Sequence, residues 1–146
     1  MTADKFTALF CEDIRTEEGN RKSYMGVIPA GIIDLPGFPG LFNSLGVIVI
    51  VETEHPRLDG ILHLRQGDGD IEIDIPFAVA RDMSERQKTG QVIVNVKLVP
   101  FPVQKPGILT VDIETKNPYQ ETFRAGTLLL RTAKPVTPPA GPPDCA

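Results

Sequence analysis

The stretch Lys5-Phe-Thr-Ala-Leu-Phe-Cys-Glu-Asp-Ile-Arg-Thr-Glu-Glu-Gly-Asn-Arg-Lys-Ser-Tyr-Met-Gly-Val27 opens the chain, and the predicted fold is organised around it. Two apolar runs, at 6–14 and 24–28, flank a polar turn at 17–20. Gly and Asn tolerate the positive φ angles that tight turns need, so this pattern predicts a β-hairpin. An acidic pair directly after a cysteine interrupts the first run and is the first place to look for chemistry.

Composition points to one globular domain built from short elements. At 146 residues the chain is long enough to bury a substantial core. Its 14 prolines and 13 glycines favour many short elements joined by turns over long helices. The net charge is −4 and no basic block stands out. Nucleic-acid binding needs clustered Lys and Arg, so we expect no nucleic-acid partner.

The apolar pattern predicts an all-β fold. Residues 47–51 are five consecutive β-branched residues, which fits a central strand with both faces covered. Shorter alternating runs at 61–65, 70–75, 91–99, 108–114 and 121–131 are separated by turn signals, as in all-β domains. We predict an antiparallel two-sheet β-sandwich of about eight strands, immunoglobulin-like or C2-like, with a closed β-barrel as the alternative.

Two connections rich in Pro and Gly, at 29–42 and 100–107, join these strands. They carry Phe38, Phe42 and Phe101, which we expect to form an exposed apolar patch of the kind that marks interfaces. Residues 80–90 predict a surface turn of helix or an exposed loop. The single domain is expected to span 1–134, and 135–146, with five prolines, to form a disordered tail.

The opening hairpin resembles a family of small uncharacterised bacterial and phage proteins. In that family a Cys-Asp/Glu-Asp-Ile/Val-Arg element precedes a Leu-Ile-Gly-Val-type strand, and a later Pro-Gly step followed by an alternating strand is similar to residues 106–111. The resemblance implies a β-sandwich of unknown function and carries no activity to transfer. The matching residues here are Cys11, Glu12, Asp13, Ile14, Arg15, Gly19, Ser23, Gly26 and Val27.

Cys11 is a weak candidate for a nucleophile. Such a cysteine needs a base within hydrogen-bond reach and a lowered pKa, and the chain offers only His55 and His63 as imidazole bases. The neighbouring Glu12 and Asp13 would raise the pKa of the thiol, because they disfavour a second negative charge. We therefore favour a buried structural cysteine, with the acids facing solvent or Arg15.

The metal-binding patterns are incomplete. A mixed site from His55, His63 and the Cys11-Glu12-Asp13 element lacks paired-ligand spacing. Asp68, Asp70 and Glu72 have the spacing that starts a calcium loop, but Ile73 and Val79 stand where an EF-hand needs Gly and Glu. An alternating strand with a wet acidic face explains these acids without a metal, and we favour it. We expect no metal and no cofactor.

These observations favour a non-enzymatic protein that acts through protein–protein contact or self-association. The alternative is a small-ligand protein, binding a nucleotide or metabolite, of phage or host-defence type; a Cys- or metal-dependent hydrolase is less favoured. No signal peptide or apolar run of bilayer length is present, so we expect a cytoplasmic chain without a membrane partner. Cys11 and Cys145 are expected to be reduced thiols.

Overall fold

The computed structural model describes residues 4–28, 31–66, 71–80 and 91–133. Within these ranges most residues lie in strands, and one short 3-10 turn covers Glu18–Asn20. None of the described residues forms a helix long and apolar enough to cross a membrane. The strands are β1 (Lys5–Thr16), β2 (Lys22–Val27), β3 (Ile32–Leu35), β4 (Gly40–Phe42), β5 (Leu45–Glu52), β6 (Arg57–Gln66), β7 (Glu72–Ala80), β8 (Gln91–Leu98), β9 (Phe101–Val103), β10 (Gly107–Asn117) and β11 (Thr122–Thr132).

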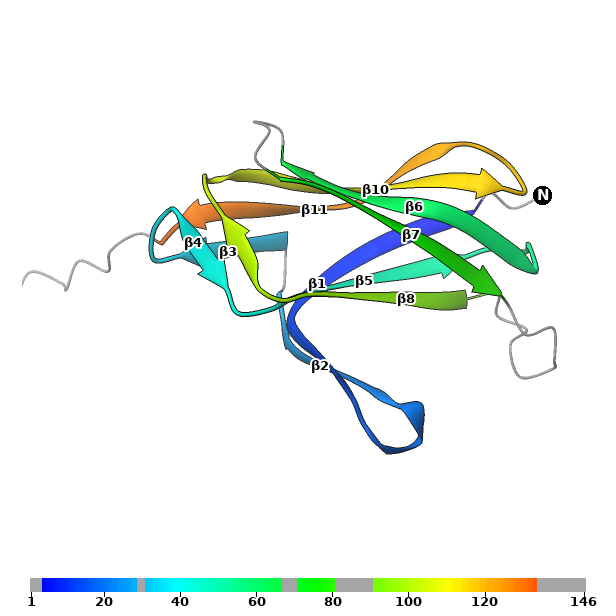
Figure 1. The fold of residues 1–146 in the computed structure, drawn as a ribbon, viewed down its shortest axis with the longest axis horizontal. Coiled ribbons are helices and arrows are strands. Elements are labelled where there is room, and N and C mark those ends of the chain that lie inside the picture. The colour runs from blue at the N-terminus through cyan, green and yellow to red at the C-terminus, as the bar shows by residue number, and fades with distance from the viewer. Residues whose placement is uncertain (1–3, 29–30, 67–70, 81–90, 134–146) are drawn as a thin grey trace, which may run out of the picture.

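The strands form two larger layers and one small sheet (Figure 1). The first sheet has the order β2-β1-β5-β8, the second has the order β3-β11-β10-β6-β7, and β4 pairs with β9 at one end. The all-β prediction is confirmed, and the two layers fit a sandwich. The closed-barrel alternative is wrong, because both larger sheets have free edges within the described residues. One pairing, β3 with β11, is parallel.

The described residues form eleven strands where about eight are predicted, and the eight longest overlap the segments predicted as strands. The three short ones, β3, β4 and β9, lie in the two Pro- and Gly-rich connections. The opening hairpin forms as expected, with Gly19 at φ 74° in its turn and β1 and β2 paired from Cys11 to Thr16. The inward faces of β10 and β5 are buried; their members are Leu109, Val111, Ile113, Val47, Val49 and Val51.

β5 is central, as its run of β-branched residues predicts, and both its faces are covered. Val47 and Val49 face the second sheet and belong to the main core. Ile48 points the other way and is nonetheless buried, in a second cluster with Cys11 and Ile14. The β1–β2 hairpin twists beneath the first sheet and supplies that cover (Figure 1).

The two Pro- and Gly-rich connections close one end of the core. β4 and β9 pair so that Phe42 lies opposite Phe101, and their rings stack with centroids 6.1 Å apart. The predicted exposure of these rings is wrong: Phe42 is 8% and Phe101 is 2% exposed. Pairing the connections turns both rings into the core, and Phe38 packs half-buried against it. Of the surface turn of helix or exposed loop predicted at 80–90, Ala80 is the last residue of β7, and positions 81–90 lie outside the described residues. The predicted tail at 135–146 and the residues Asp68, Asp70 and Cys145 also lie outside them.

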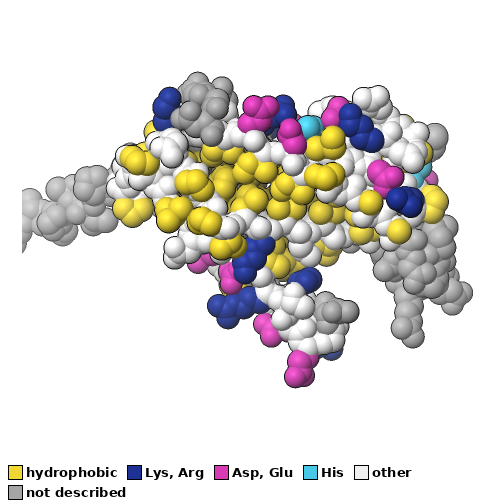
Figure 2. Space-filling view, in the orientation of Figure 1, with side chains coloured by type: hydrophobic (Ala, Val, Ile, Leu, Met, Phe, Trp, Pro, Cys, Tyr) yellow, Lys and Arg dark blue, Asp and Glu magenta, His cyan; other side chains and the backbone are white. Residues whose placement is uncertain are grey.

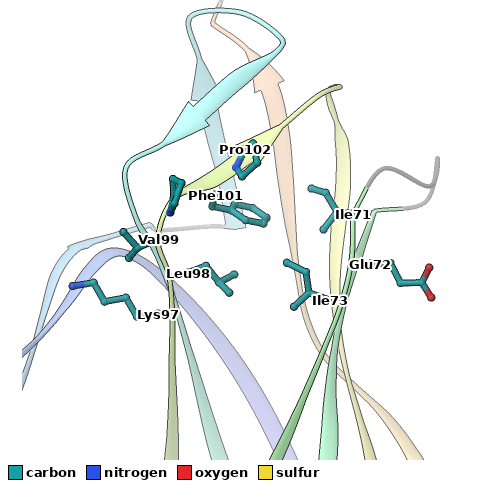
Figure 3. Close-up of a pocket in the computed structure, with 9 residues that line it drawn as sticks. Ile71, Glu72, Ile73, Lys97, Leu98, Val99, Phe101 and Pro102 are labelled. Carbon is teal, nitrogen blue, oxygen red and sulfur yellow. The ribbon is translucent and has the colours of Figure 1, made fainter.

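The two layers meet closely on one side and stand apart on the other. On the closed side, a Cβ atom at Gly126 of β11 would lie 3.0 Å from the Cβ of Ala8 on β1. On the other side, the edge strands β7 and β8 diverge toward the β4–β9 end (Figures 1 and 3). Val79 of β7 is buried, but most of their inward side chains are only half-buried. The half-buried ones are Ile73, Ile75, Phe77, Val92, Val94, Val96 and Leu98.

Candidate functional site

Cys11 lies under the hairpin, on the outer side of the first sheet, and is fully buried. Its Sγ donates a hydrogen bond of 3.4 Å to the backbone oxygen of Asp13. Burial, and to a lesser extent the charge of Asp13, raises the pKa of the thiol, although the hydrogen bond opposes this. Cys11 is therefore held as a neutral thiol packed against Ile14 and Ile48, as expected for a structural cysteine.

Asp13 joins the hairpin to β8. Its carboxylate lies 2.8 Å from Nζ of Lys97 and 3.1 Å from Nε of Arg15. Hydrogen bonds from Lys97 first, and then from Arg15, lower the pKa of Asp13. The predicted contact with Arg15 is present, whereas the pair with Lys97 was not foreseen because Lys97 lies on a distant strand. Glu12 is exposed beside Gly26, which leaves its carboxylate toward solvent.

His63 lies on the outer face of the second sheet, between two carboxylates. Its Nδ1 is 2.5 Å from Asp74 of β7, and its Nε2 is 3.1 Å from Glu114 of β10. Partial burial is the largest effect on its pKa and lowers it, but the hydrogen bonds with Asp74 and Glu114 outweigh it, so the pKa of His63 is raised. The imidazolium acts as a bridge across three strands.

This arrangement does not form a metal centre. The two nitrogens of His63 point in opposite directions, so its carboxylate partners cannot converge with it on one ion. Within the described ranges, no cluster of three or more His, Cys, Asp or Glu side chains could hold a metal ion.

His55 lies in the turn between β5 and β6. Its ring packs 5.5 Å from that of Tyr119, and its Nε2 lies 3.8 Å from the carboxylate of Asp4. Asp4 also accepts a hydrogen bond of 2.5 Å from the Tyr119 hydroxyl. Cys11, His55 and His63 therefore belong to three separate contact networks, and the structure does not assemble them into one site.

The open side between β7 and β8 forms an apolar slot instead. Hydrophobic side chains make a continuous stripe along it, with charged groups above and below (Figure 2). At the wide end lies a pocket of about 450 Å³. Ile73, Leu98 and Phe101 point into the gap, whereas Glu72 and Lys97 point away from it on opposite rims (Figure 3).

The two edges that border the slot differ in how they could accept another strand. β7 carries Pro76, which cannot donate a backbone hydrogen bond, and the exposed acids Glu72 and Asp74. β8 pairs with β5 along its whole length, from Gln91 to Leu98, and contains no proline. Its other edge has no strand partner within the described residues.

Sequence reasoning missed this slot. The alternation of β7 and β8 correctly predicts which side chains point inward, but it does not tell which strands lie at the edges of the sheets. Pro76 is the one local signal, because proline within a strand is typical of an edge. β8 carries no such signal.

The chain has no match among protein-family models, curated proteins or solved structures. The likeness of the opening hairpin to small bacterial and phage proteins therefore stays a prediction. The function has to be inferred from the geometry of the site.

Proposed function

We propose that this chain is a non-enzymatic β-sandwich protein, immunoglobulin-like or C2-like in arrangement, that acts through protein–protein contact at its open side. The observation that carries the proposal is the edge of β8, which has no strand partner among the described residues and borders a slot of half-buried apolar side chains. An added strand would pair with the free backbone groups of β8 and cover the slot with its own apolar side chains.

The chemistry of the β8 edge supports this proposal. Native proteins usually protect exposed edges with charges, prolines or bulges, because an unprotected edge recruits other strands. β8 has one charged residue, Lys97, and it is paired with Asp13 at 2.8 Å. The edge of β7 has both a proline and exposed acids. The edge of β8 lacks these protecting features, whereas the edge of β7 has them. This difference supports a role for β8 in pairing with another strand.

The candidate catalytic groups favour a non-enzymatic role. Cys11 is buried as a neutral thiol. Both nitrogens of His63 are engaged by carboxylates, and His55 packs on Tyr119. A nucleophile needs an adjacent base and access to substrate, and these side chains lie in separate structural contacts.

Site-directed photocrosslinking in living cells tests the proposal. A photoreactive amino acid at Ile93, exposed on β8, should give a covalent adduct with one protein of defined mass. The same amino acid at Ile108 is the matched control, since both residues are about half exposed, at 50% and 54%. The absence of any protein adduct at position 93, or equal adducts at both positions, would contradict the proposal.

A second candidate function rests on the pocket at the wide end of the slot. Its volume of about 450 Å³ is that of a small-molecule site, and its apolar lining between Glu72 and Lys97 suits a small amphipathic metabolite. Thermal-shift screening against nucleotides and metabolites tests it. A hit should be lost when Leu98→Trp fills the pocket; no shift across the set would exclude this function.

A further inference from the structure

We infer that the partner at the open side is a second copy of this chain, paired with the first through β8 and β8 in antiparallel fashion about a two-fold axis at Val94. This inference rests on the proposed function and specifies its partner. Its support comes from the pattern of β8, the charges beside it and the unequal widths of the two layers.

The pattern of β8 is complementary to itself in this register. With Val94 opposite Val94 of the second copy, Val92 faces Val96 and Ile93 faces Asn95. Residues directly opposite in an antiparallel pair share one face of the sheet. The inward valines of both copies therefore line up on the core side, and Gln91, Ile93, Asn95 and Lys97 line up on the outer side. A shift by one residue would mix the two faces.

The charges agree with the same register. Gln91 lies opposite Lys97 of the second copy, and the side chain of Gln91 already donates a hydrogen bond of 3.1 Å to Glu52. The outer face then presents the row Glu52, Gln91, Lys97 and Asp13, in which acids flank the cation from both copies. No like charges lie opposite one another, so the pairing has no electrostatic cost of that kind.

The two layers also differ in their number of long strands, and a second copy would cover the apolar side chains that this difference leaves half-exposed. In the described residues the second sheet places four long strands, β11, β10, β6 and β7, over three in the first sheet, β1, β5 and β8. β2 adds no cover there, because it pairs only with the distal part of β1 and turns beneath the sheet. The inward residues Ile73, Ile75 and Phe77 of β7 consequently stay half-exposed.

A two-fold pairing at β8 brings two such slots face to face. The first sheets of the two copies become one continuous sheet, and the open sides meet above it. Half-exposed side chains of each copy then pack against their equivalents, which removes apolar surface from water in both copies at once. β7 cannot serve as the paired edge in the same way, because Pro76 interrupts its donors.

Disulfide trapping in the full chain tests the partner and the register together. Cys145→Ser leaves buried Cys11 as the only native thiol, and Ile93→Cys and Asn95→Cys are introduced on separate chains. Mild oxidation of the mixture should give a 93–95 linked dimer, at a yield several-fold above that of either variant alone. A dimer that traps equally well at 93 alone would overturn the register.

Sedimentation analysis of the full chain completes the test. The unmodified protein should be a dimer, and Ile93→Lys should weaken the dimer at least about tenfold, because the new lysine lies diagonal to Lys97 of the second copy. Ile108→Lys is the matched control and should leave dimerisation unchanged, while thermal melting shows that both variants fold. A protein that is monomeric at all concentrations overturns the inference. If photocrosslinking at Ile93 then captures a different protein, the proposed function stands and only the identity of the partner is wrong.

Discussion

Ala8 on β1 and Gly126 on β11 touch across the interface between the two sheets. A Cβ atom at Gly126 would lie 3.0 Å from the Cβ of Ala8 and 3.2 Å from its backbone oxygen. The two layers can approach this closely only because one strand has no side chain there and the other has the smallest one. This contact closes one side of the structure, and the slot lies on the opposite side.

Gly126→Ala should therefore destabilise the protein. The added methyl group must push β1 away from β11, since a backbone atom stands in its path, and overpacking of this kind costs about 1–3 kcal/mol. Urea unfolding measures the change. Gly37→Ala is the control, because no atom lies within 4 Å of the position of its Cβ. Equal stability of the two variants would mean that the closed side is less tightly packed than the distances imply.

Gly46→Ala should destabilise the attachment of the hairpin by a similar amount, about 1–3 kcal/mol. Its Cβ would lie 2.5 Å from Sγ of Cys11 and 2.7 Å from Cγ1 of Ile14. Removing the sulfur relieves the first clash, so Cys11→Ala combined with Gly46→Ala should cost less than the sum of the single changes. A double-mutant cycle with a coupling below about 0.5 kcal/mol would contradict this contact.

Phe101→Ala should cost about 3–5 kcal/mol, because it empties the end of the core that β4 and β9 close. The ring is 2% exposed and stacks on Phe42. Leu41→Ala, in the same small sheet but 59% exposed, should change the stability by less than about 0.5 kcal/mol. Similar small losses for both variants would favour an exposed, interface-type role for Phe101.

The bridge at His63 should make stability depend on pH. Folding raises the pKa of His63, so its contribution is fully present below the ordinary pKa and is lost as pH rises through the raised value. The pKa values of Asp74 and Glu114 are lowered, so their contribution is lost as pH falls through those values. The bridge therefore stabilises the fold at pH values above the lowered pKa values of Asp74 and Glu114 and below the raised pKa of His63.

His63→Gln should lower the urea midpoint more at about pH 5.5 than at about pH 8.5. At the lower pH the imidazolium attracts both carboxylates. At the higher pH the neutral ring no longer does, although Arg65 still lies 3.1 Å from Asp74 and Lys116 still lies 3.3 Å from Glu114. Arg57→Gln removes the surface pair with Asp59 and serves as the control. A loss that is the same at both pH values would show that the contact is not charge-dependent.

Cys11 should react slowly with thiol reagents in the folded protein. It is fully buried and its pKa is raised, so both access and thiolate content are low. In the full chain carrying Cys145→Ser, alkylation by iodoacetamide should be at least about a hundredfold slower in buffer than in urea. Comparable alkylation rates in buffer and in urea would contradict this prediction and support a reactive cysteine.

Much of the fold follows from local patterns in the sequence. A strand repeats every two residues, so alternation alone places Leu109, Val111 and Ile113 on one face of β10. The unbroken run at 47–51 similarly indicates a strand covered on both sides. The acids after Cys11 argue against a nucleophile before any coordinates are known, because charge effects between neighbours need no knowledge of distant partners.

Which strands pair and which side chains meet depends on contacts between distant parts of the chain. Only the tertiary structure shows these contacts. Phe42 and Phe101 are buried because β4 and β9 pair across 59 positions of sequence. No local pattern in either segment predicts this pairing. His63 meets Asp74 and Glu114 from three strands, and Asp13 meets Lys97 from two. The slot arises in the same way. Whether β8 is an edge or a central strand depends on how many strands each layer holds, and alternation along one strand carries no information about that number.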